Sequence, residues 1–288
     1  MKKAIGRFLL SPEFQRSLLA PPSRWALRML DPLFNFGIRF KMDMQLLERG
    51  HYAYCMMNAS ILAKSLGHSR ISAIEFGVAG GNGLKFMCDF AEEVHKATGV
   101  TIECYGFDTG GGMPPPDGAR DLPYWFQSGQ YKMDVAALKA RVPNAKLVLG
   151  EIRDTLPDFI RTHNPAPIGV VFNDTDYWSS TRDSLILFDL AQENPEIFLP
   201  RIFVYLDDII GSEIEMYGPY NGQLLAVEEY NGRQDSVKLH LNQNLLNTDY
   251  LPWRWQIYYA HLFKHPQYEK YVGAARQGLI ESALRLRS

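Results

Sequence analysis

Four aspartates at the ends of two apolar segments are the residues of this chain best suited to chemistry. They are Asp174 and Asp176, which follow the segment 168–173, and Asp207 and Asp208, which follow the segment 201–206. Carboxylates gathered in one crevice repel one another unless they are solvated, protonated or bridged by a cation. Oxygen ligands without histidine or cysteine nearby favour a hard ion, Mg²⁺ or Ca²⁺, over zinc.

These acids have two interpretations. In the first, Asp174, Asp207 and Asp208 bind a divalent ion that polarises a substrate hydroxyl, and Asp176 takes the proton as general base. In the second, Asp207 and Asp208 cap a turn and Asp174 forms an Asx turn. The metal site is favoured because both groups of acids follow strands of one predicted sheet, whose carboxyl ends meet at one edge.

A glycine-rich turn joins the apolar segment 71–76 to a helix expected from Leu84 onward. Its glycines are Gly77, Gly80, Gly81 and Gly83. They carry no Cβ, so the backbone there could touch a ligand and the first helical N–H groups would face it. The alternative is a tight turn without a ligand, because such patterns also arise by chance. Asp108 favours a nucleotide-like ligand, since it ends the next strand, where a ribose-binding acid belongs.

Alternating strand and helix patterns place these residues on a sheet. Strands are expected at 71–76, 101–107, 146–150, 168–173 and 201–206, with two later strands near 236–241 and 255–262. Helices are expected at 50–66, 84–98, 134–141 and 180–192. The short Val, Ile and Phe runs are typical of strands buried on both faces. The predicted fold is α/β: a Rossmann-like, doubly wound, mostly parallel sheet with an antiparallel edge strand and an N-terminal helical extension.

The domain prediction is an extension over residues 1–50 followed by one catalytic domain over 51–288. Residues 1–43 contain eight basic and three acidic side chains among aromatic and aliphatic ones, although the whole chain has a net charge of −2. The extension could cover a substrate pocket, pair subunits in a homo-oligomer, or lie on a membrane. Pro21, Pro22 and Pro32 interrupt any long amphipathic helix, so membrane contact is the less favoured interpretation.

The composition of the chain argues against a nucleic-acid-binding or membrane-spanning protein. A net charge of −2 lacks the basic footprint typical of nucleic-acid binding, so a small-molecule partner is expected. Three widely spaced cysteines among apolar residues indicate buried thiols of a reducing compartment, and we expect a cytoplasmic protein. No segment is long and apolar enough to predict a membrane span.

Two further features bear on function. The Gly/Pro-rich loop over 109–133 follows a strand end, and its length predicts a lid or substrate-binding loop. His261 and His265 have a spacing that could line one helix face. Pro266 and the aromatic strand pattern before them argue against a helix, so a polar packing role is expected.

Five motifs in this order resemble the class I S-adenosylmethionine-dependent methyltransferases, especially the metal-dependent sugar O-methyltransferases of the macrocin O-methyltransferase family. The motifs are residues 75–83, 105–109, 150–157, 174–181 and 207–208. The resemblance implies that Glu75 and the four glycines border the methionine part of the cofactor. It also implies that Asp108 holds the ribose, that Ile152 and Arg153 lie against the adenine, and that Asp174, Asp207 and Asp208 carry Mg²⁺.

The sequence departs from the family pattern near the first metal ligand. Some related enzymes have a basic residue three positions after that ligand, but here the position is Tyr177. Asp176 is therefore the expected base. Trp178 replaces the family's usual tyrosine, which could alter contacts with the acceptor.

The resulting prediction is an enzyme that transfers a methyl group from S-adenosylmethionine to a hydroxyl of a sugar or related polar metabolite, with Mg²⁺. An NAD-dependent oxidoreductase is the first alternative. It is disfavoured because Ala79 occupies the place of the second glycine and Asp108 lies too far along the chain. A methyltransferase-like protein that binds without turnover is the second alternative.

Overall fold

The computed structural model describes residues 22–248, 250–273, 277 and 284. By internal contacts the chain divides into two units, Met1–Gly50 and His51–Ser288. Residues 1–21 of the predicted N-terminal extension, with the basic side chains at positions 2, 3, 7 and 16, lie outside the described residues. The second unit contains the whole sheet.

Seven strands form one sheet in the order β3-β2-β1-β4-β5-β7-β6. Their bounds are β1 Arg70–Phe76, β2 Thr101–Asp108, β3 Lys146–Leu149, β4 Ile168–Asn173, β5 Phe198–Leu206, β6 Val237–Leu241 and β7 Ile257–Leu262. The pairs among β1 to β5 are parallel, whereas β7 is antiparallel to both β5 and the edge strand β6. The predicted fold, a mostly parallel sheet with antiparallel pairing at one edge, is confirmed.

The strands form where the sequence has short runs of β-branched and aromatic residues. All six residues of β4 are buried, as are six of the seven in β1, because helices cover both faces of the sheet. Strand β5 begins three residues earlier than predicted and includes Pro200. The pairing of β4 with β5 shifts register there, and proline is tolerated at such irregular positions.

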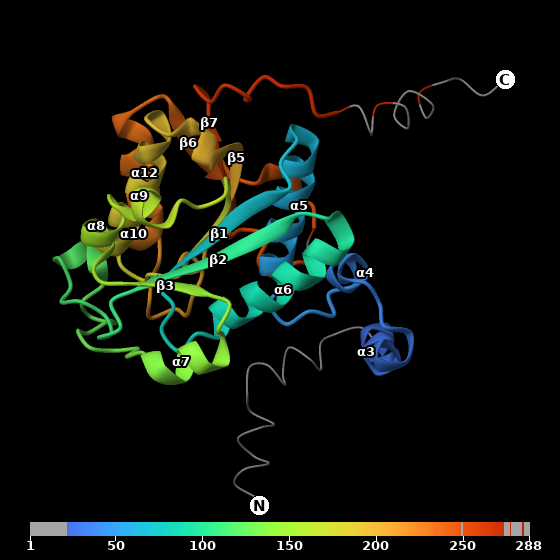
Figure 1. Cartoon of the computed structure of the whole chain (residues 1–288). Helices are drawn as coiled ribbons and strands as arrows, with labels where there is room; N and C mark the ends of the chain where they lie inside the picture. The colour runs from blue at the N-terminus through green and yellow to red at the C-terminus, as the bar shows by residue number, and fades with distance from the viewer. Residues whose placement is uncertain (1–21, 249, 274–276, 278–283, 285–288) are drawn as a thin grey trace, which may run out of the picture. The chain divides into compact units, whose positions relative to one another are not determined.

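Helices α5 and α6 lie on one face of the sheet, and α8, α9, α10 and α12 lie on the other (Figure 1). The bounds are α5 Gly50–Leu66, α6 Asn82–Thr98, α7 Val135–Arg141, α8 Ile152–Thr155, α9 Phe159–His163, α10 Trp178–Ser184, α11 Ile186–Asp189 and α12 Gly222–Arg233. The described residues also include the short 3₁₀ helices η1 Ala119–Asp121, η2 Leu190–Gln192, η3 Pro195–Ile197 and η4 Gln243–Leu245.

The helix predicted over 180–192 is divided into α10, α11 and η2. Ser184, the last residue of α10, donates its hydroxyl to the carbonyl of Thr181 at 2.7 Å. It also accepts from the Asn173 amide at 2.6 Å. Such side-chain bonds compete with helix hydrogen bonds and explain a break that hydrophobic periodicity does not reveal.

In the described part of the first unit, the helices are α3 Pro22–Phe34 and α4 Ile38–Asp43. No residue of α3 is buried, and its side chains Met29 and Leu33 are 77% and 78% exposed. Pro32 lies inside α3, which ends two residues later. Within the described residues, no helix combines the length and apolar character needed to cross a membrane.

Candidate active site

The predicted site residues follow the carboxyl ends of five neighbouring strands. Along this edge, Ile152 comes after β3, Asp108 ends β2, the glycine turn follows β1, Asp174 follows β4, and Asp207 and Asp208 follow β5. Chain connections run in opposite directions from β1 and β4, so these two strands form the topological switch point. Ligands of open α/β sheets bind at this position.

The glycine turn lies directly against the backbone that carries Asp174. Gly77 has a φ of +83°, and a Cβ added to it would lie 1.7 Å from the carbonyl oxygen of Asp174. Any side chain at position 77 would therefore push the two strand ends apart. Gly81 also has positive φ and is the N-cap of α6, which begins at Asn82, two residues before the predicted start.

Glu75 lies beneath the glycine turn. Its side chain is almost fully buried, and its Oε1 accepts from the hydroxyl of Tyr52 at 2.5 Å. A Cβ on Gly83 would lie 1.8 Å from the same Oε1. Tyr52 is fixed in turn by stacking on Phe172 of β4, with ring centroids 3.8 Å apart. Sequence reasoning missed Tyr52 because its partner is 23 residues away and on another element.

Asp108 holds the glycine turn through backbone hydrogen bonds. Its Oδ2 accepts from the N–H groups of Val78 and Ala79 at 3.0 and 2.9 Å. Its Oδ1 accepts from the N–H of Gly110 at 2.6 Å. A carboxylate has about four lone-pair positions, so capacity for one further donor is left on Oδ1. A ribose hydroxyl could use that position.

The region assigned to the adenine forms the short helix α8 after β3. Ile152 packs against the main core, whereas the side chain of Arg153 is 60% exposed and 4.0 Å from Glu151. The N–H of Gly150 donates to the carbonyl of Asp108 at 2.9 Å and so joins the ends of β3 and β2. Ile152 is therefore better placed than Arg153 to form an apolar wall.

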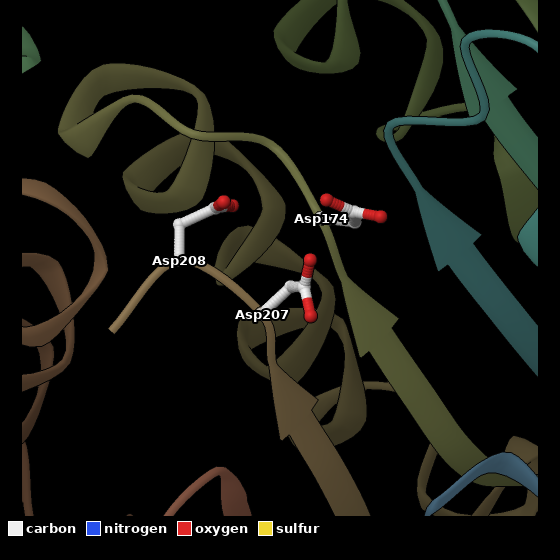
Figure 2. Close-up of side chains that lie close together, drawn as sticks. All are labelled: Asp174, Asp207 and Asp208. Carbon is white, nitrogen blue, oxygen red and sulfur yellow. The ribbon is translucent and has the colours of Figure 1, made fainter. Parts of the chain in front are cut away.

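Asp174, Asp207 and Asp208 converge at the ends of β4 and β5, where Figure 2 shows their side chains around one space. One carboxylate oxygen from each lies within 4.8 Å of the other two. Asp174 and Asp207 are half-buried, and Asp208 is buried. This donor set consists of oxygens only, as hard divalent cations require.

Neighbouring side chains orient two of these carboxylates. The hydroxyl of Tyr205 donates to Asp207 Oδ1, and the amide of Gln223 donates to Asp208 Oδ2 at 3.1 Å. Gln223, from α12, also donates to the carbonyl of Asn173 at 3.2 Å. Partners of this kind fix the direction of metal-ligating carboxylates. The sequence gives no signal for Gln223, because α12 is remote from both strand ends.

The electrostatics of this cluster reflect crowded negative charge. Burial raises the pKa of Asp208 well above its ordinary value, and the charges of Asp176, Asp174 and Asp207 raise it further. Burial likewise raises the pKa of Asp176 to about 6. A bound cation would favour the charged form of each acid and reverse these shifts.

Asp176 stands in a strained turn beside the three acids. Its φ of 59° is left-handed, which is uncommon for a residue other than glycine. Its N–H donates to Asp208 Oδ2 at 2.8 Å, and the N–H of Tyr177 donates to the carbonyl of Thr175 at 2.5 Å. The turn therefore brings Asp176 beside Asp208.

Two loops contribute tyrosines near the acids. The pKa of Tyr131 is raised first by burial and then by the charges of Asp176 and Asp208, and the pKa of Tyr217 is raised for the same reasons. The hydroxyl of Tyr124 donates to the carbonyl of Glu215 at 2.8 Å and joins the two loops. Sequence analysis indicated the first loop as functional but did not identify these tyrosines.

The histidines His261 and His265 have packing roles. His261 lies on β7, and its Nδ1 is 2.7 Å from the hydroxyl of Tyr268. His265 is buried, with Nε2 donating to the carbonyl of Phe198 at 3.0 Å and Nδ1 accepting from the N–H of Gln267 at 3.0 Å. The expected polar packing role is confirmed.

The strand order and the acids at the strand ends define a Rossmann-like α/β fold, with a mostly parallel sheet and ligand-type residues along one edge. No family model matches the chain. No curated protein matches it either.

Several solved structures are similar in fold. CalS11, described as a calicheamicin methyltransferase, is 19% identical, with 87% of this chain and 93% of that chain covered and a TM-score of 0.49. The O-methyltransferase NovP is 16% identical, with 73% and 78% covered and a TM-score of 0.46. A structure of CmcI with Mg and SAM is 18% identical, with 70% of each chain covered and a TM-score of 0.38. These likenesses concern the fold.

Proposed function

We propose that the protein is an S-adenosylmethionine-dependent O-methyltransferase that uses Mg²⁺. One observation carries the proposal: the glycine turn after β1 touches the backbone of Asp174, whose carboxylate converges with those of Asp207 and Asp208. A nucleotide-cradling turn and an all-oxygen cation site thus meet at the switch point of one sheet. A methyl donor and an activated hydroxyl need this proximity.

The residues of the turn fit the cofactor. A Cβ on Gly80 would meet nothing within 4 Å, so the backbone there is open to a ligand. Oδ1 of Asp108 retains capacity for a ribose hydroxyl. Gly77, Gly81 and Gly83 shape the turn, and buried Glu75 supports it from below.

The acids fit a hard cation. Asp174, Asp207 and Asp208 would hold Mg²⁺, because their oxygens converge without nitrogen or sulfur donors. Tyr205 and Gln223 would keep Asp207 and Asp208 in their orientations. Among the described residues, no other group of three or more His, Cys, Asp or Glu side chains has metal-binding geometry.

S-adenosylmethionine would supply an electrophilic methyl group, and Mg²⁺ would lower the pKa of an acceptor hydroxyl. Asp176 would accept the proton released from that hydroxyl as the oxygen–methyl bond forms and the sulfur–methyl bond of the cofactor breaks, with S-adenosylhomocysteine as the leaving group. Its left-handed turn and the bond from its N–H to Asp208 hold it beside the metal ligands. Tyr131 and Tyr217 would line the acceptor site, where a sugar or a related polar metabolite is the proposed substrate.

We further propose that residues 1–50 form a helical extension distinct from the catalytic domain over residues 51–288. The cytoplasm is the proposed location, and the three free thiols Cys55, Cys88 and Cys104 support it.

The experiment is methyl transfer from labelled S-adenosylmethionine to a panel of glycosides and polar metabolites, with Mg²⁺ or with EDTA. We expect transfer in Mg²⁺ and none in EDTA. Asp176→Asn should lower kcat by about 10²- to 10⁴-fold while S-adenosylhomocysteine still binds. If calorimetry detects cofactor binding but label never leaves the cofactor with any acceptor, the protein is a binding protein without turnover.

A further inference from the structure

The loop over residues 109–133 is docked on the site through one buried carboxylate. Asp121, in the 3₁₀ helix η1 of this loop, is 0% exposed although it has no basic partner among the described residues' ion pairs. Its Oδ1 accepts from the N–H of Ser179 at 2.8 Å, and its Oδ2 accepts from the hydroxyl of Ser179 at 2.6 Å. Oδ2 also accepts from the N–H of Asp117 at 2.6 Å. One side chain therefore joins the loop to the start of α10.

Apolar contacts seal the same junction. Leu122, which follows Asp121, packs with Phe126 and Tyr177 in a cluster whose members are at most 2% exposed. The rings of Phe126 and Tyr177 lie 5.9 Å apart in an edge-to-face arrangement. Burial of this cluster removes water from the hydrogen bonds of Asp121, which strengthens them.

A second contact lies beside the first at the protein surface. The guanidinium of Arg120 lies 4.8 Å from the ring centroid of Trp178 and donates to Glu229 at 3.0 Å. The indole N–H of Trp178 donates to the same Glu229 at 2.8 Å. These groups are partly exposed, so this contact adds less to docking than the buried carboxylate does.

The docked residues immediately follow the proposed base. Asp176, Tyr177 and Ser179 belong to one short stretch, in which Asp176 holds a left-handed φ. Asp121 and Leu122 contact Ser179 and Tyr177, so the loop and the turn of Asp176 are held as one body. A left-handed aspartate persists only where its surroundings determine it.

We propose that Asp121 is a positioning residue, which fixes both the acceptor loop and the turn of Asp176 through Ser179. The kinetic consequence rests on the proposed function, whereas the effect on the loop does not. Asp121 touches neither the cation site nor the glycine turn, so cofactor and Mg²⁺ binding should survive its loss. The rate of methyl transfer to the acceptor should fall.

Hydrogen exchange of the full chain, read by mass spectrometry, tests docking without any substrate. In Asp121→Ala, peptides covering 109–133 and 174–179 should exchange at least about tenfold faster than in the wild type. Asp121→Asn should lie between the two, because an amide can still accept from the Ser179 N–H but carries no charge. Asp117→Ala is the control for the exposed part of the junction: it removes a carboxylate that is 67% exposed and 3.8 Å from Arg182 of α10, and it leaves the Asp117 N–H in place.

Steady-state kinetics test positioning. Asp121→Ala should lower kcat/KM for the acceptor by about 10- to 100-fold, while the Kd of S-adenosylhomocysteine changes less than about twofold. Ser179→Ala should give a smaller loss, and that substitution should add little in the Asp121→Ala background because both changes break the same contact. Asp121→Asn should recover part of the rate.

Three results would overturn the proposal: wild-type exchange in Asp121→Ala, faster exchange with unchanged acceptor kinetics, or equal loss of cofactor and acceptor binding. If Asp121→Ala does not fold, Ser179→Ala tests the same contact from the other side. A wild-type protein without methyl transfer would refute the proposed function, and faster exchange of 109–133 and 174–179 would still support the docking role.

Discussion

Replacing Asp207 by asparagine should stabilise the metal-free protein and abolish its response to Mg²⁺. One oxygen from each of the three carboxylates lies within 4.8 Å of the other two, and two unit charges 4.8 Å apart repel by about 3.5 kcal/mol at an effective dielectric constant of 20. Replacing Asp207 removes the repulsion between its carboxylate and that of Asp174. Both are half-buried, and solvent screening reduces the expected gain to about 1–2 kcal/mol.

Magnesium should make the wild type more stable than Asp207→Asn, the reverse of their order without the ion. An ion that binds only the folded wild type adds about 2.7 kcal/mol at a concentration 100 times its Kd. In Asp207→Asn, the new amide oxygen can still accept from the Tyr205 hydroxyl, but the side chain lacks the charge that Mg²⁺ requires. The wild type should therefore be the less stable protein in EDTA and the more stable one in saturating Mg²⁺.

Calorimetric melting in EDTA and across a MgCl₂ titration measures both effects. For a domain of this size, 1 kcal/mol corresponds to about 2–4 °C in Tm. Asp235→Asn is the control, since that carboxylate is 99% exposed and lies outside the cluster. A destabilised Asp207→Asn protein in EDTA, or one that keeps the full Mg²⁺ shift, would refute the reasoning.

Two further predictions concern the turn and a buried histidine. Gly80→Ala should leave the urea unfolding free energy unchanged but weaken S-adenosylhomocysteine binding at least tenfold by calorimetry, because position 80 is open only until a ligand fills it. Gly77→Ala should lose about 2–4 kcal/mol of unfolding free energy, because the added Cβ would meet the backbone of Asp174 and the φ of residue 77 is positive. Equal unfolding free energies of the Gly77→Ala and Gly80→Ala variants would contradict the turn geometry. Burial lowers the pKa of His265 below 6.5. The neutral His265 side chain therefore contributes its full stabilisation above pH 6.5, and this stabilisation is lost as the pH falls through the folded-state pKa. In urea unfolding between pH 8 and 5, His265→Gln should therefore lose less stability than the wild type on acidification, and parallel curves would show that His265 does not contribute to this loss.

The positions of the strands and of the acids that follow them could be predicted from the sequence because both are local features. Short apolar runs bounded by acids or glycines identified β1, β2, β4 and β5, and parallel strands present their carboxyl ends at one edge. The convergence of Asp174 with Asp207 and Asp208 follows from that rule and is confirmed by their geometry. Helix ends were less accurate, as the break at Ser184 depends on a bond from Asn173.

Contacts between distant segments were decided only by the tertiary structure. Local patterns marked Glu75 and Asp108 as acids near a ligand, but packing gave Glu75 its buried partner Tyr52 and gave Asp108 the N–H groups of Val78 and Ala79. The same holds for Asp121, an ordinary loop residue in the sequence whose partner Ser179 lies 58 positions further on. Periodicity reports which face of an element is apolar, whereas the pairing of two polar groups from separate loops exists only once the sheet has brought their strand ends together.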